Sequence, residues 1–192
     1  MYSMGGGLSK MRLLKIMLVG LDNAGKTTFI KWLRSNLNGN PGQNLNTVPT
    51  VGYNMEKFVK NNFQYQIYDM SGQSKYREMW NNYCKEIVGI IFVIDSTDYL
   101  RFQVVANEVE LLLEQEDIKN RPVPILFLAN KSDMQGAIAI ESMKEKLKLS
   151  VITDRQWEIF QTNSLKGANI ENGFQWLTVS ITKAFPEAKY QN

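Results

Sequence analysis

The chain has 192 residues, a length that suits one domain with a full hydrophobic core. Its 22 basic and 19 acidic residues leave a net charge of only +3, without a run of Lys or Arg, so nucleic acid is not an expected partner. The lone Cys84 offers no disulfide framework and favours a reducing compartment such as the cytoplasm. The longest apolar run, near 87–94, has the length of a buried strand and is too short for a membrane span.

Residues 1–12 are expected to form a flexible, Gly-rich N-terminal segment that lacks the apolar stretch of a signal peptide. Read from Met4, this segment fits the myristoylation pattern M-G-x-x-x-[ST], which would make Gly5 the acylated residue if Met4 were the true start. The alternative is a plain disordered tail, so the lipid signal stays open. Residues 187–192 are interpreted as a C-terminal tail without a prenylation box.

The first predicted strand, at 12–19, leads into a loop that fits the phosphate-binding pattern G-x-x-x-x-G-K-[ST], and a helix follows. Glycines in such a loop let backbone N–H groups turn toward an anion. Lys26 adds a charge that reaches the β- and γ-phosphates, and Thr27 offers a hydroxyl to Mg²⁺. The expected phosphate-binding residues are Gly20, Leu21, Asp22, Asn23, Ala24, Gly25, Lys26, Thr27 and Thr28.

Beyond a polar loop at 36–48, apolar patterning predicts a hairpin and then alternating strands and helices. Asn61 and Asn62 suit the hairpin turn because Asn tolerates positive φ. The later strands are expected at 53–60, 63–69, 88–95, 123–129 and 157–161, and the later helices at 75–86, 100–114, 138–149 and 171–185. The side chains available to the inner face of the helix at 100–114 are Val104, Val105, Val109, Leu112 and Leu113.

This alternation predicts an α/β fold of three layers, in which a six-stranded, mostly parallel sheet has one antiparallel edge strand and helices on both faces. The folded domain is expected to span 13–186.

A second motif, N-K-x-D, follows the strand at 123–129 and indicates a guanine site. The Asp133 carboxylate can accept hydrogen bonds from N1–H and the 2-amino group of guanine, which adenine lacks, and such a site discriminates by roughly 10⁴–10⁵. The stem of Lys131 can lie on the base plane, and Asn130 can tie this loop to the phosphate loop.

A third motif, D-x-x-G-Q, supplies groups for the metal and the γ-phosphate. Asp69, at a strand end, would hold Mg²⁺ through a water, and Thr50 would complete the Mg²⁺ shell when the γ-phosphate is present. The Gly72 N–H would bond the γ-phosphate, and Gln73 would orient the attacking water.

These motifs stand in the order found in the small GTPases, and the chain resembles the Arf and Arf-like branch of that family. The resemblance rests on the phosphate loop, on Pro-Thr-Val-Gly at 49–52, on Trp-Asn-Asn-Tyr at 80–83 and on the stretch at 93–98. Shorter stretches resemble the Arf-like members linked to Bardet–Biedl syndrome, namely 69–73, 117–119, 124–127 and 165–167.

The resemblance implies the P-loop GTPase fold and a GTP/GDP switch, with Gln73, Lys26 and Gly72 as catalytic residues. Its implied regulators are an exchange factor and a GTPase-activating protein. In the GTP state such proteins move to a membrane surface and recruit a coat, which for the Bardet–Biedl-linked members is the BBSome at the cilium. Activation slides the two strands at 53–69 and displaces residues 1–12, and the implied effector patch is Tyr53, Tyr68 and Tyr83.

Three positions depart from the family pattern or affect the rate. Ser71 stands where Arf proteins have a second Gly. The last base-binding loop is placed at 160–162, so Gln161 would offer its N–H to guanine O6. Asp22 stands where faster small GTPases resemble one another in having Gly, which predicts crowding beside the γ-phosphate and slow hydrolysis, and no Arg is assignable as an arginine finger in cis.

Alternative functions stay open at this point. A GTP-binding scaffold without hydrolysis is disfavoured by Gln73, Thr50 and Asp69, and a P-loop phosphotransferase is disfavoured by the guanine motif. An Arf-like regulator of a different vesicle-trafficking effector also fits.

Overall fold

The computed structural model describes residues 11–40, 42–43 and 45–186, so the candidate acylation site Gly5 and the C-terminal tail lie outside the described residues. The strands are β1 (Arg12–Val19), β2 (Tyr53–Lys60), β3 (Phe63–Met70), β4 (Gly89–Asp95), β5 (Ile125–Asn130) and β6 (Trp157–Gln161). The α-helices are α1 (Lys26–Leu37), α2 (Phe102–Glu114), α3 (Glu116–Lys119), α4 (Ile140–Lys146) and α5 (Ile170–Ala184). Three 3-10 helices are η1 (Ser74–Tyr83), η2 (Tyr99–Arg101) and η3 (Leu149–Val151).

The strands form one sheet in the order β2-β3-β1-β4-β5-β6. The edge strand β2 is antiparallel to β3, and every other neighbouring pair is parallel. The tight turn between β2 and β3 places Asn61 at φ 48 and Asn62 at φ 65. The predicted fold class, with its single antiparallel edge strand, is therefore confirmed.

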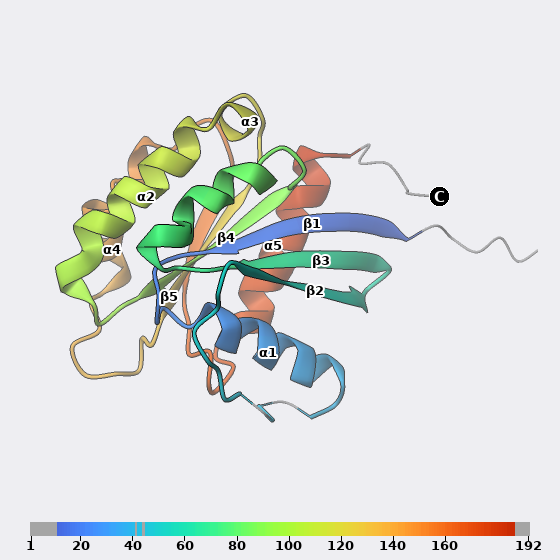
Figure 1. Cartoon of the computed structure of the whole chain (residues 1–192), viewed down its shortest axis with the longest axis horizontal. Helices are drawn as coiled ribbons and strands as arrows, with labels where there is room; N and C mark the ends of the chain where they lie inside the picture. The colour runs from blue at the N-terminus through green and yellow to red at the C-terminus, as the bar shows by residue number, and fades with distance from the viewer. Residues whose placement is uncertain (1–10, 41, 44, 187–192) are drawn as a thin grey trace, which may run out of the picture.

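Helices cover both faces of the sheet and give two separate cores (Figure 1). On one face, α1 and α5 contribute Phe29 and Phe174 to a cluster that includes Leu126. On the other face, Val105 of α2 and Met143 of α4 pack in the second cluster. No helix among the described residues has the length and apolar character needed to cross a bilayer.

The structure corrects two details of the helix predictions. The segment predicted as a helix at 75–86 is the 3-10 helix η1, in which Trp80 is the buried residue. Within α2, Val104 is 38% exposed, whereas Val105 is buried. The inward stripe follows the spacing of residues three and four apart, and Val104 lies off it because the stripe starts at Phe102.

The carboxyl ends of the parallel strands meet along one edge of the sheet, which is where open α/β sheets bind ligands. The phosphate loop follows Val19 at the end of β1, and the D-x-x-G-Q motif follows the end of β3. The N-K-x-D motif begins at Asn130, the last residue of β5. The topology thus brings all three motifs to one place.

Candidate nucleotide-binding site

A cleft of about 680 Å³ lies at this edge, a size typical of small-molecule sites. Its walls come from five segments of the chain, at 22–28, 47–50, 71–73, 130–134 and 163–166. The lining residues include Asp22, Asn23, Gly25, Lys26, Thr27, Thr28, Thr50, Gly72, Gln73, Asn130, Lys131 and Asp133. The cleft therefore brings together most of the residues that the motifs single out.

The two motif glycines of the phosphate loop are required by their surroundings. Gly20 and Gly25 have φ values of 133 and 100. A Cβ at Gly20 would lie 2.1 Å from the Val93 carbonyl oxygen, and a Cβ at Gly25 would lie 2.2 Å from Asn130 Nδ2. Leu21 and Ala24 also belong to the loop. Their side chains are buried, so only their backbone is available to a ligand.

Lys26 is buried beneath the loop with its ammonium group paired to the protein. Its side chain is buried, and Nζ donates a hydrogen bond of 2.7 Å to the Leu21 carbonyl. Burial lowers the pKa of Lys26 to about 8, although the carboxylates of Asp69 and Asp22 act against that effect. A bound phosphate could therefore replace the Leu21 carbonyl as the hydrogen-bond partner of Lys26.

Three residues with side-chain oxygens, Thr27, Thr50 and Asp69, lie close together. Thr27 Oγ1 donates a hydrogen bond of 2.8 Å to Asp69 Oδ2, and it lies 3.1 Å from Thr50 Oγ1. Asp69 Oδ1 is buried without a hydrogen-bond partner among the described residues, and burial raises the pKa of Asp69 despite the Thr27 hydrogen bond. Two hydroxyls and one carboxylate with an unsatisfied oxygen fit the preference of Mg²⁺ for hard oxygen ligands.

The segment after β3 packs directly on the phosphate loop. A Cβ at Gly72 would lie 2.3 Å from the Asp22 nitrogen, so only Gly fits there. Ser71 Oγ donates to the Thr50 carbonyl over 2.8 Å, and the Ser71 N–H donates to the Gly52 carbonyl over 2.9 Å. Ser71 therefore joins the Thr50 segment to the Gly72 segment, which gives this departure from the family pattern a structural role.

The N-K-x-D residues form the other end of the cleft. Asn130 Nδ2 donates to the Ala24 carbonyl over 2.7 Å, which ties the two loops as predicted. Lys131 has φ 60, and its Nζ lies 2.5 Å from Asp95 Oδ2. The exposed Asp133 carboxylate lies 3.1 Å from Lys166 Nζ, and this hydrogen bond lowers the pKa of Asp133.

The chain after β6 reaches the cleft two to three residues beyond the position predicted for the last base-binding loop. Gln161 ends β6, is exposed and does not line the cleft. The Thr162 N–H still bonds Ala129 of β5, so the chain turns toward the cleft only afterwards. The buried Ser164 takes the place assigned to Gln161, and its N–H and hydroxyl both donate to Asn130 Oδ1 over 2.9 Å. The lining residues that sequence reasoning missed include Asn163, Ser164, Leu165 and Lys166, and also Thr47, Val48 and Met134.

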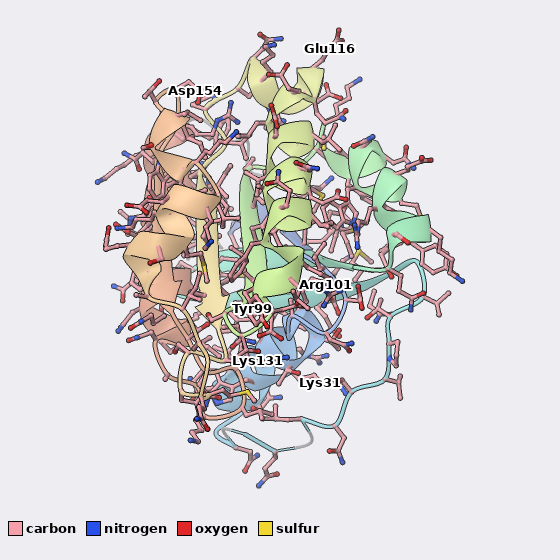
Figure 2. All side chains as sticks on the ribbon, turned by 90° about the vertical axis from the view of Figure 1, so that its left-hand side faces the viewer. Lys31, Tyr99, Arg101, Glu116, Lys131 and Asp154 are labelled. Atoms are coloured by element: carbon pink, nitrogen blue, oxygen red, sulfur yellow. The ribbon has the colours of Figure 1, made fainter. Side chains whose placement is uncertain are left out.

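Asp22 has partners that the sequence did not reveal. Arg101 Nη1 donates to Asp22 Oδ1 over 2.9 Å, and Arg77 Nη2 lies 3.9 Å from the same oxygen. Figure 2 shows Arg101 beside Tyr99 at the N-terminal end of α2. The Asp22 carboxylate is thus held toward η2 and η1.

Comparison with known protein families identifies the family of the chain. Residues 2–181 match the model of the ADP-ribosylation factor family. The chain belongs to this family. As an Arf-like small GTPase, it is 40% identical over 175 residues to ADP-ribosylation factor-like protein 6 of Danio rerio, with 91% of each chain covered. It is 38% identical to ADP-ribosylation factor 1 of Brassica rapa subsp. pekinensis, with 87% of each covered.

A solved structure is also similar to this Arf-like GTPase. It is that of the Arl6 BBS3 small GTPase from Trypanosoma brucei with the bound nucleotide analogue GppNp. The TM-score is 0.81 at 38% identity, covering 90% of this chain and 99% of that one. The resemblance stated from the sequence motifs is confirmed.

The three tyrosines of the implied effector patch form one cluster in the Arf-like GTPase. The ring centroid of Tyr83 lies 5.0 Å from that of Tyr53 and 4.8 Å from that of Tyr68. Burial raises the pKa of Tyr83 to about 12, together with its contact with Tyr53. The cluster joins β2, β3 and η1, although its part in effector binding stays a prediction.

Proposed function

We propose that this Arf-like GTPase is a switch that binds GTP with Mg²⁺, hydrolyses it slowly and recruits a membrane coat in the GTP state. The observation that carries the proposal is that Lys26, Thr27, Thr50, Gln73 and Asp133 line one cleft, with Asp69 hydrogen-bonded to Thr27.

Each group has one role in the proposed reaction. Lys26 would bind the β- and γ-phosphates, Gly72 would donate its N–H to the γ-phosphate, and Gln73 would orient the attacking water. Thr27, Thr50 and Asp69 would hold Mg²⁺, with Asp69 acting through a water, and the bound ion would neutralise charge on the phosphates. Asp133 would select guanine.

Competition with a fluorescent GDP derivative tests this assignment of the cleft. GDP and GTP should displace the probe at similar concentrations, ATP should fail to displace it, and chelation of Mg²⁺ should speed its release. Displacement by ATP as effective as that by GTP would contradict the guanine assignment.

The arginines nearest the phosphate loop support a slow intrinsic rate. Arg101 is paired with Asp22 and Asp98, and Arg77 is paired with Glu108. Arginines engaged in this way are not positioned to stabilise the transition state, so an activating protein would supply one.

For the effector, we infer a coat of the BBSome type at the cilium base, reached from the cytoplasm by reversible membrane association. The inference is supported by the resemblance to the Bardet–Biedl-linked members and by the identity to the factor-like protein 6 relative. A different vesicle-trafficking effector is the second candidate, because identity to an ADP-ribosylation factor 1 is 38%.

Pull-down from ciliated cells with two locked variants separates these candidates. Gln73→Leu should hold the GTP state and retain BBSome subunits, and Thr27→Asn should not retain them. Retention of another coat by Gln73→Leu, without BBSome subunits, would favour the second candidate.

The proposed lipid anchor is tested separately. Mass spectrometry of the protein from its native cell should find myristate on Gly5 if Met4 is the start. An intact Met1 on all molecules would rule this modification out. One myristoyl chain gives only marginal membrane binding, so a second contact is required.

A further inference from the structure

The phosphate loop carries a carboxylate in a cleft that must accept a polyphosphate. Asp22 lines the cleft together with Gly72 and Gln73, the residues assigned to the γ-phosphate. Asp133 marks the guanine end, so Asp22 belongs to the γ-phosphate end. A carboxylate that turned into the cleft there would repel the γ-phosphate.

Arg101 holds Asp22 at two points. Its Nη1 donates to the Asp22 carboxylate over 2.9 Å, and its Nη2 donates to the Asp22 carbonyl over 3.2 Å. Asp98 fixes the guanidinium from the other side, because Arg101 Nε donates to Asp98 Oδ2 over 2.5 Å. A planar guanidinium held in this way sets the direction of the carboxylate and also supplies its counter-charge.

Arg77 adds a weaker hold and links Asp22 to the Gly72 segment. It lies 3.9 Å from the Asp22 carboxylate, and it donates to the Gly72 carbonyl over 2.8 Å and to Glu108 over 2.8 Å. Arg77 is shared among these groups and lies farther from the Asp22 carboxylate than Arg101 does. Arg101 therefore makes the stronger contact with Asp22.

We propose that Arg101 is a positioning residue that keeps the Asp22 carboxylate turned away from the cleft and thereby sets the affinity of the phosphate loop for GTP relative to GDP. The proposal rests on the proposed function of the cleft. Without Arg101, the Asp22 carboxylate keeps only its weaker contact with Arg77 and is a poorly compensated negative charge at the γ-phosphate end. GTP meets that charge directly, whereas GDP, which lacks the γ-phosphate, meets it at a greater distance.

The test is the ratio of two dissociation constants, for GDP and for a non-hydrolysable GTP analogue. Arg101→Ala should weaken binding of the GTP analogue by about 10-fold and binding of GDP by less than about 3-fold. Arg101→Lys, which keeps the charge but loses the fork geometry, should give an intermediate ratio and serves if Arg101→Ala folds poorly.

Two further variants separate this role from a merely structural one. Arg34→Ala removes an arginine of α1 that pairs with Glu56 and does not line the cleft, so the ratio should not change. In an Asp22→Asn background, Arg101→Ala should leave the ratio nearly unchanged, because no carboxylate remains to be positioned.

Equal losses of affinity for both nucleotides in Arg101→Ala would overturn the proposal. It would also be overturned if Arg101→Ala changed the ratio of the two dissociation constants in the Asp22→Asn background as well. If the unaltered protein bound neither nucleotide, the proposed function itself would fail and this inference with it. The two failures are therefore distinguishable.

Discussion

At the scale of single residues, the groups proposed to bind GTP already have protein partners. Lys26 donates to the Leu21 carbonyl, Thr27 donates to Asp69, and Asp133 is paired with Lys166. The Leu21 carbonyl presents a negative dipole to Lys26, as a phosphate oxygen would, and Lys166 offers donor hydrogens to Asp133, as guanine would. Thr27 differs, because it donates to Asp69 here but would turn its oxygen toward a metal ion. Nucleotide binding therefore exchanges hydrogen bonds, and its free energy depends on the difference between the two sets.

Lys26 makes this exchange measurable through protons. Its pKa lies at about 8 because burial disfavours the ammonium form, and a bound phosphate would raise that pKa again. Nucleotide binding should therefore take up protons at about pH 9 but few at pH 7, and affinity should fall as pH rises above the lowered pKa. Calorimetric titration in two buffers of different ionisation enthalpy measures this uptake. Equal proton uptake at both pH values would contradict the role of Lys26.

Asp133 makes base selection measurable. Asp133→Asn should weaken GTP binding by about 10–100-fold and shift preference toward xanthine nucleotides, because an amide can donate to the xanthine 2-oxo group. Asp154→Asn is a matched control, since Asp154 pairs with Arg155 and does not line the cleft. The assignment is wrong if Asp133→Asn binds GTP as tightly as the unaltered protein.

Contiguous motifs such as the phosphate loop predicted their residues well, because loop geometry there depends on neighbours in the sequence. The contact of Asp22 with Arg101 spans 79 positions, and no local pattern announces it. Gln161 lies outside the cleft because β6 extends to this residue, and strand ends depend on pairing with the neighbouring strand β5.

At the scale of elements, strand and helix positions were predictable from apolar periodicity, but their close approaches were not. Gly167, in the loop that carries Leu165 and Lys166, packs against the ring of Trp32 in α1. A Cβ at Gly167 would lie 2.0 Å from that ring, and the residue has φ 79. The backbone conformation and the ring contact both require Gly.

Gly167→Ala should therefore lower the free energy of unfolding by about 2–4 kcal/mol, combining backbone strain with overpacking. Gly39→Ala is the control, because Gly39 has φ 75 but no atom of the described residues lies within 4 Å of an added Cβ. It should cost only about 1 kcal/mol. Urea unfolding measures both, and equal losses would show that the Trp32 contact contributes nothing.

At the scale of the whole molecule, the sheet joins the nucleotide cleft to the tyrosine cluster. β3 carries Tyr68 and Asp69 next to each other near its end, and Ser71 then bonds the Thr50 segment. A change at the γ-phosphate end therefore acts on the strands that hold the tyrosines. The sequence predicted which strands exist, whereas their order in the sheet came from the structure.

Single-turnover hydrolysis of GTP by the purified protein tests the switch most directly. We expect a rate at or below about 10⁻⁴ per second alone, and acceleration of about 10³-fold or more by a partner that supplies an arginine. Gln73→Leu should abolish most of the stimulated rate and leave GTP affinity nearly unchanged. Turnover near one per second without any partner would show that the chain completes its own catalytic site, and the account of a slow, partner-controlled switch would be wrong.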